Sequence, residues 1–162
     1  MVDGPGFRTA IYCAGCRHQC PGCHNPQSWD FSGGRPATTD ELMRIIEADP
    51  YTRGVTFTGG DPMYQPEGFA ELADAIRQRT PQKDIWCYTG FTFEQLITNP
   101  RQRALLEQID VLVDGPFLRE QRDETLLFRG SRNQRIIDVQ ASLAKGSIVC
   151  APEHDEQVSK AL

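Results

Sequence analysis

Hydrophobic positions along the chain follow two spacings, and each spacing predicts one kind of element. Short runs rich in β-branched and aromatic residues are typical of strands, whereas apolar residues at i, i+3, i+4 and i+7 are typical of an amphipathic helix. The helical spacing is clearest in Glu67–Arg79, where Phe69, Leu72, Ala73 and Ile76 share one face. Strands are predicted at Thr9–Ala14, Val55–Thr58, Ile85–Thr89, Ile109–Val113 and, less clearly, Ile136–Val139.

Two further helical segments lie between these predicted strands. Thr39 or Asp40 is expected to cap a helix that runs to Asp49. A weaker helical pattern covers Phe93–Gln108 and is interrupted by Pro100. Strands that alternate with helices predict an α/β protein with a parallel sheet and right-handed crossovers.

A polar or glycine-containing cluster follows four of the predicted strands. Parallel α/β sheets bind ligands at the carboxyl ends of their strands, whether the sheet is open or barrel-like. We therefore expect the functional site at this edge. The clusters are the loop that contains Cys16, then Gly59–Asp61, Thr89–Gly90 and Asp114–Gly115.

Length and charge narrow the class of protein. The 162 residues suit one domain, and we expect a domain over residues 1–145 followed by a polar tail over 146–162. The net charge of −5 argues against a nucleic-acid binder, which carries a basic stripe. There is no apolar stretch of membrane-spanning length and no signal peptide at the start, so a cytoplasmic location without membrane contact is expected.

The cysteines are clustered, since four of the six lie between Cys13 and Cys23. In a cytoplasmic chain such a cluster points to metal or redox chemistry before disulfides. Cys16, Cys20 and Cys23 have the spacing C-x3-C-x2-C. Iron–sulfur clusters are held by thiolates, normally four of them, so three thiolates leave one iron of a four-iron cluster open to a ligand.

Spacing alone leaves two other interpretations open. His18 or His24 would complete a Cys3His zinc site with the same three thiolates. Cys13 would supply a fourth thiolate and close an electron-transfer cluster, although its place in a predicted strand is typical of a small buried residue. Cys87 and Cys150 are not expected to be ligands.

Six blocks of residues stand in a fixed order over roughly residues 2–140. They are Asp3-Gly4-Pro5-Gly6-x-Arg8, Gly15-Cys16-x-His18-x-Cys20-Pro21-Gly22-Cys23-x-Asn25, Gly59-Gly60-Asp61-Pro62, Asp84-Ile85-Trp86-x-x-Thr89-Gly90, Val111-Leu112-Val113-Asp114-Gly115 and Arg129-Gly130-Ser131-x-Asn133-Gln134. The cysteine loop after the first strand and the Gly-Gly-acid turn after the second resemble the radical S-adenosylmethionine enzymes. The full set resembles the activating enzymes of the anaerobic class of ribonucleoside-triphosphate reductase. Members of that family usually carry a further short segment before Asp-Gly-Pro-Gly, so either the start lies upstream of Met1 or the sheet edge is less covered.

This resemblance implies a fold and a cofactor set. The expected fold is an incomplete TIM-type β/α barrel with parallel strands, since four or five strands are too few for an eight-stranded barrel of about 250 residues. Cys16, Cys20 and Cys23 are expected to hold a [4Fe–4S] cluster, with S-adenosylmethionine chelating the open iron. The implied activity is that of an oxidoreductase that forms a 5′-deoxyadenosyl radical.

The resemblance also assigns contacts with S-adenosylmethionine. Gly22 and His24, which flank the last cluster ligand Cys23, are expected on the adenine side, and Cys23 is counted with them as cofactor-binding. For His24 an ordinary surface-loop position stays open. The carbonyl oxygens of Gly59 and Gly60 are expected to accept from the ammonium group. For two acidic residues the alternatives stay open. Asp61 adds charge complementarity or makes an ordinary Asp-Pro turn, and Asp114 meets the ribose hydroxyls or forms an Asp-Gly turn.

The partners follow from the same resemblance. The expected substrate is one glycine in a C-terminal loop of the large anaerobic reductase subunit, met by a rim that includes Gly4, Gly6 and Arg129–Gln134. Within that rim, Arg129, Ser131 and Asn133 suit either the cofactor or the partner protein. An external reductant such as flavodoxin or ferredoxin is also expected. The alternatives are a radical enzyme acting on a deazapurine-type small molecule and a zinc-binding module without turnover.

Overall fold

Five strands form one sheet in the order in which they occur along the chain. The computed structural model describes residues 3–151. The strands are β1 (Arg8–Cys13), β2 (Gly54–Gly59), β3 (Asp84–Tyr88), β4 (Val111–Asp114) and β5 (Arg135–Asp138). Each of the first three pairings is parallel, whereas β5 runs antiparallel to β4.

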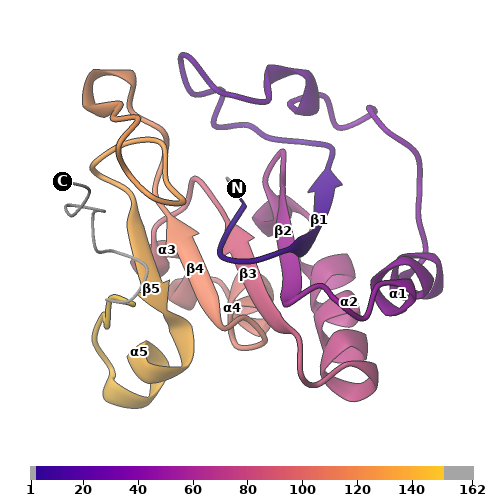
Figure 1. Cartoon of the computed structure of the whole chain (residues 1–162). Coiled ribbons are helices and arrows are strands. Elements are labelled where there is room, and N and C mark those ends of the chain that lie inside the picture. Colours follow the sequence, from indigo (N-terminus) through magenta and orange to yellow (C-terminus); the bar gives the residue numbers. More distant parts are fainter. Residues whose placement is uncertain (1–2, 152–162) are drawn as a thin grey trace, which may run out of the picture.

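Helices connect the parallel strands and lie on one face of the sheet (Figure 1). The α-helices are α1 (Thr39–Ala48), α2 (Pro66–Arg79), α3 (Phe93–Thr98), α4 (Pro100–Leu106) and α5 (Val139–Lys145). Short 3₁₀ turns are η1 (Pro26–Ser28), η2 (Pro62–Tyr64) and η3 (Arg119–Gln121). The predicted helices are thus present, and α5 is one that the sequence patterns did not predict.

Local capping explains where two of the helices begin. The cap of α1 is Thr38, and not Thr39 or Asp40, because its side chain accepts from the backbone of Glu41 while the Glu41 carboxylate accepts from the backbone of Thr38. The predicted helix Phe93–Gln108 is two helices. Asn99 caps the second one, and Pro100 occupies its first position, where no backbone N–H is needed.

The main apolar core lies between the sheet and its helices. Alternate strand residues that face the helices, such as Val55, Phe57 and Ile85, are fully buried against the apolar faces of α1 to α4. Leu72 and Ile76 of α2 pack into this core, as the helical spacing predicts. This layer makes the sheet a fixed platform for the loops at its ends.

The opposite face of the sheet has no helix layer in the described chain. A second small cluster contains Trp86, Val113, Ile136 and Ala151. The N-terminal segment crosses this face, and the carbonyl oxygen of Asp3 accepts a hydrogen bond from Thr56 at 2.7 Å (Figure 1).

The α/β class and the mostly parallel sheet confirm the sequence-based expectation, but two parts of it need correction. A partial barrel is not confirmed, because the sheet remains open between β1 and β5. The expectation that all strands are parallel is wrong for β5. A loop with only a single 3₁₀ turn joins β4 to β5, and without a crossover helix the chain returns antiparallel along the neighbouring strand.

Part of the expected polar tail pairs with the sheet. The backbone N–H of Asp138 donates to Val149 at 2.9 Å, and that of Ala151 donates to Ile136 at 2.9 Å. The rest of the expected tail, residues 152–162, lies outside the described residues. Within residues 3–151, no helix is long and apolar enough to cross a membrane.

Candidate metal and cofactor site

A cavity of about 480 Å³ lies at the carboxyl ends of the parallel strands. Two loops flank it above the strand ends in Figure 1. Residues 14–38, between β1 and α1, form the cysteine loop, and residues 115–134, between β4 and β5, form the return loop. The predicted site residues that line the cavity are Cys16, Cys20, Cys23, His24, Gly59, Gly60 and Asp61.

All three motif cysteines carry free, partly exposed thiols that border this cavity. Backbone N–H groups approach each sulfur: those of His18 and Gln19 face Cys16, that of Phe117 faces Cys20, and that of Asn25 donates to Cys23 Sγ at 3.4 Å. Burial raises the pKa values of the Cys16 and Cys20 thiols, against the lowering effect of these N–H groups. Such N–H···S contacts also tune iron–sulfur clusters.

The donor set of the cavity suits a polynuclear cluster. Within the described residues, no three His, Cys, Asp or Glu side chains are grouped closely enough to hold a single metal ion. Three thiols border one cavity, and thiolates are the donors that hold iron–sulfur clusters. The residues present therefore fit a [4Fe–4S] cluster by the chemistry of their donor atoms.

The surrounding backbone leaves no room for a side chain at Gly59 or Gly60. Gly59 has a φ of +100°, and a Cβ atom there would lie 2.6 Å from the backbone nitrogen of Cys13. A Cβ atom on Gly60 would lie 2.5 Å from the carbonyl oxygen of Gly15 and 2.9 Å from that of Ser28. The missing side chain of Gly60 thus makes room for the cysteine loop, which the sequence analysis did not anticipate.

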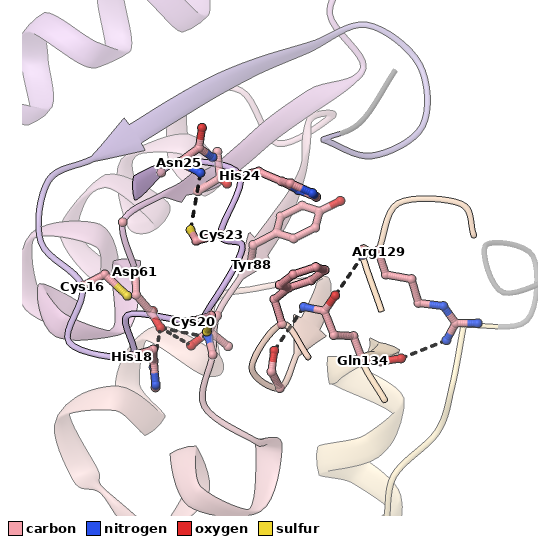
Figure 2. Close-up of a pocket in the computed structure, with 18 of the residues that line it drawn as sticks. Cys16, His18, Cys20, Cys23, His24, Asn25, Asp61, Tyr88, Arg129 and Gln134 are labelled. Atoms are coloured by element: carbon pink, nitrogen blue, oxygen red, sulfur yellow. Dashed lines mark hydrogen bonds and ion pairs between the residues drawn. The ribbon is translucent and has the colours of Figure 1, made fainter. Parts of the chain in front are cut away.

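Asp61 lines the cavity, yet its carboxylate is directed at the protein. The residue is 1% exposed. Its Oδ2 atom accepts from His18 Nε2 at 3.0 Å, Thr89 Oγ1 at 2.9 Å and the Gly90 backbone at 2.9 Å, while Oδ1 accepts from the Met63 backbone at 2.9 Å. Figure 2 shows this group beside Cys16 and Cys20. The carboxylate therefore ties the cysteine loop to the ends of β2 and β3.

Asp114 and Gly22 are two predicted site residues that are not among those lining the cavity. The Asp114 side chain is buried and forms an ion pair with Arg135, and it also accepts from the Phe93 backbone at 2.8 Å. Its neighbour Gly115 lines the cavity instead. The wall therefore offers backbone at this position. A contact with the ribose was one of two alternatives left open for Asp114, and the other was an Asp-Gly turn.

The other cysteines lie away from the cavity wall. Cys13 is packed against the main core, and burial raises the pKa of its thiol to about 12. Cys87 is fully buried in β3, and Cys150 is exposed and pairs with Ile137. That none of the three is a ligand stays a prediction.

Two tyrosines that the sequence analysis did not single out also line the cavity. Tyr12 in β1 donates to Asp3 at 3.2 Å, and Tyr88 in β3 donates to the carbonyl oxygen of Phe128 at 2.9 Å. Both occupy the strand face opposite the helices, near the carboxyl end of their strands. Side chains alternate between the two faces along a strand, and this alternation could have placed both tyrosines on the face opposite the helices.

Most of the Arg129–Gln134 block organises the return loop. The Gln134 side chain accepts from the backbones of Gly130 and Ser131 at 2.9 and 3.2 Å, and Asn133 donates to the carbonyl oxygen of Pro116 at 2.7 Å. Figure 2 shows Arg129 and Gln134 across the cavity from the cysteines. Arg129, Gly130 and Gln134 line the cavity, whereas Ser131 is fully buried.

Comparison with known proteins assigns the chain to a class. Residues 2–137 match the family described as "4Fe-4S single cluster domain". The relatives include three proteins named "Anaerobic ribonucleoside-triphosphate reductase-activating protein". The one from Vibrio cholerae is 42% identical over 142 residues, which cover 84% of this chain and 90% of the relative. Those from Haemophilus influenzae and Escherichia coli are 40% and 38% identical over 144 and 140 residues, covering 84% and 83% of this chain and 90% of each relative.

The fold and the cavity thus belong to an iron–sulfur domain of the single-cluster class. Within that class, the chain belongs to the family of anaerobic ribonucleoside-triphosphate reductase-activating proteins.

Proposed function

We propose that this chain activates an anaerobic ribonucleoside-triphosphate reductase by placing a glycyl radical on it, using S-adenosylmethionine and a [4Fe–4S] cluster. The observation that carries the proposal is the convergence of Cys16, Cys20 and Cys23 on one cavity with the Gly59–Gly60 turn. The names of the relatives supply the target, a reductase that needs activation.

The residues of the chain have binding and lining roles in this proposal. Cys16, Cys20 and Cys23 would hold three irons, and the Gly59 and Gly60 backbone would bind the methionyl ammonium group. With both groups bound, the cluster would supply a single electron for reductive cleavage of S-adenosylmethionine, and this chemistry would remove a hydrogen atom from the partner's glycine. Tyr12 and Tyr88 form part of the wall of the cavity in which both groups would lie.

The open side of the sheet supports a protein substrate. Since β1 and β5 do not meet, an extended loop of a partner has a route to the cavity. The reductant is proposed to be a flavodoxin or ferredoxin, which would supply the single electron.

The test is an anaerobic reconstitution of the full chain with iron and sulfide. The reduced protein should convert S-adenosylmethionine to methionine and 5′-deoxyadenosine. With the cognate reductase it should produce a doublet in electron paramagnetic resonance, whose splitting collapses when the partner's glycine is deuterated at Cα. Cleavage of the cofactor without a radical on the reductase would contradict the protein-substrate proposal, and a colourless protein that retains zinc would contradict the cluster.

A further inference from the structure

The Asp61 carboxylate is held by donors of the protein itself. Three donors share its Oδ2 atom and one donates to Oδ1. With 1% of the residue exposed, the carboxylate presents almost no surface to a further charged group. Asp61 therefore lacks the geometry to bind the cofactor's ammonium group directly.

The four donors come from separate parts of the fold, and His18 is the one that belongs to the cysteine loop. Met63 lies in η2, whereas Thr89 and Gly90 follow β3. His18 stands between Cys16 and Cys20, and because a carboxylate oxygen accepts hydrogen bonds, its Nε2 atom is the donor. A single side chain thus joins the segment that carries the thiols to the ends of two strands.

The surroundings of His18 are shaped to hold its ring. The ring packs edge-on against Phe91 with centroids 4.6 Å apart, and Tyr64 lies at 5.5 Å. A Cβ atom on Gly90 would lie 2.5 Å from the ring, so the absence of a side chain at Gly90 leaves room for it. The next residue, Gln19, adopts a φ of +47°, which is uncommon for a residue other than glycine. The uncommon backbone conformation thus directly follows the residue whose ring is packed.

We propose that Asp61 and His18 are positioning residues, which hold the thiols of Cys16 and Cys20 in register with the Gly59–Gly60 turn. The inference rests on the proposed function. The position of the thiols relative to the turn matters only if one ligand must reach both the open iron and the turn. Backbone contacts at the start of the loop, such as the 2.9 Å bond from the Asp61 N–H to the Gly15 carbonyl, fix where the loop begins. The His18 side chain fixes where the cysteines themselves lie.

The test compares His18→Leu with His18→Gln in the full chain. Leucine keeps an apolar group of similar size but removes the donor, whereas the amide nitrogen of glutamine reaches a position similar to Nε2 and restores it. Arg17→Leu is the matched control, since Arg17 is exposed, lies over the Phe31 ring at 5.4 Å and has no bond to Asp61. Hydrogen exchange of residues 16–23 measures how firmly the cysteine loop is held against the strand ends. A titration of the cluster's paramagnetic resonance spectrum with S-adenosylmethionine measures how well the cofactor binds when the thiols and the turn are aligned.

We expect His18→Leu to speed exchange of residues 16–23 and to weaken cofactor binding by about tenfold or more. Because the buried Asp61 carboxylate loses a donor, the melting temperature should also fall. His18→Gln and Arg17→Leu should stay within about threefold of the wild type, since a tenfold change is the size of one lost hydrogen bond to a charged group. If His18→Leu does not fold, Gly90→Ala should give the same two effects, because its Cβ displaces the ring.

Wild-type behaviour of His18→Leu in both measurements would overturn the proposal, as would a glutamine variant as impaired as the leucine one. If the wild-type protein binds no S-adenosylmethionine, the proposed function fails. The exchange measurement then still decides whether His18 docks the loop.

Discussion

The two loops that flank the cavity are held in different ways. The return loop is closed on itself by side chains, since Gln134 and Asn133 bond to backbone groups within it, and Tyr88 holds it to the sheet. The cysteine loop is held by backbone bonds, such as that from Gly15 to Ser28 at 2.7 Å, and by the His18 side chain, while its thiols border the cavity. One wall is therefore built without a ligand, whereas the other has donors that a bound cluster would complete. This difference predicts which changes affect cofactor loading and which affect only stability.

The largest expected effect comes from the thiols. Cys16→Ala, Cys20→Ala and Cys23→Ala should each abolish the brown colour after anaerobic reconstitution, because two thiolates do not retain a four-iron cluster. Cys13→Ala should retain the colour, since Cys13 is packed against the core. Iron and sulfide analysis measures the result, and loss of the cluster in the Cys13 variant would show that it is a ligand.

The next effect in size is expected at the contact between the strand end and the cysteine loop. Gly60→Val should destabilise the fold by about 1–3 kcal/mol and reduce cluster loading, because its side chain would overlap the backbone of Gly15 and Ser28. Gly68→Val is the control for β-branching, since a Cβ at Gly68 in α2 meets nothing within 4 Å. Denaturant unfolding and iron content measure the two effects. A Gly60 variant with a normal cluster but weak cofactor binding would show that the glycine serves the cofactor alone.

Gly60 also illustrates how much of the site can be predicted from the sequence. The pattern predicted the strands, the helices and the edge that carries the site, because hydrophobic periodicity records which faces are buried. It predicted that the cysteines converge, since their spacing is local. It did not reveal that Gly60 faces the cysteine loop or that Asp61 pairs with His18, 43 positions away. Such contacts depend on the packing of distant segments, which leaves no periodic signal. For the same reason the sequence missed the ion pair that withdraws Asp114 from the cavity.

The return loop should tolerate loss of the cluster but not of Gln134. Gln134→Leu removes three accepted bonds and the donation to Gly115 at 3.1 Å, so we expect a loss of about 1–3 kcal/mol and faster hydrogen exchange at residues 129–134. Cluster content should remain unchanged. Gln78 is an exposed residue of α2, and Gln78→Leu serves as the control for exchanging glutamine for leucine. Removal of iron from the wild type should instead speed exchange at residues 16–23. Equal responses of the two loops to iron removal would refute the contrast.

The smallest expected effect concerns the ion pair that joins the end of the return loop to α3. Arg135 in β5 binds Glu94 at 2.8 Å, and its hydrogen bonds lower the pKa of Glu94 to about 2. A carboxyl whose pKa is lowered by folding stabilises the protein above its unfolded pKa of about 4.3, and the stabilisation is lost as the pH falls towards 2.

The Glu94 side chain is 56% exposed, so solvent screening limits the contribution to about 0.5 kcal/mol. Urea unfolding should show Glu94→Gln less stable than the wild type at pH 6, with the difference shrinking as the pH falls from about 4 towards 2. Glu124→Gln is the control, because its partner Arg122 lies in the same loop and the Glu124 side chain is 81% exposed. A difference that grows on acidification would mean that Glu94 destabilises the folded state. The ion pair would then not anchor the return loop to α3.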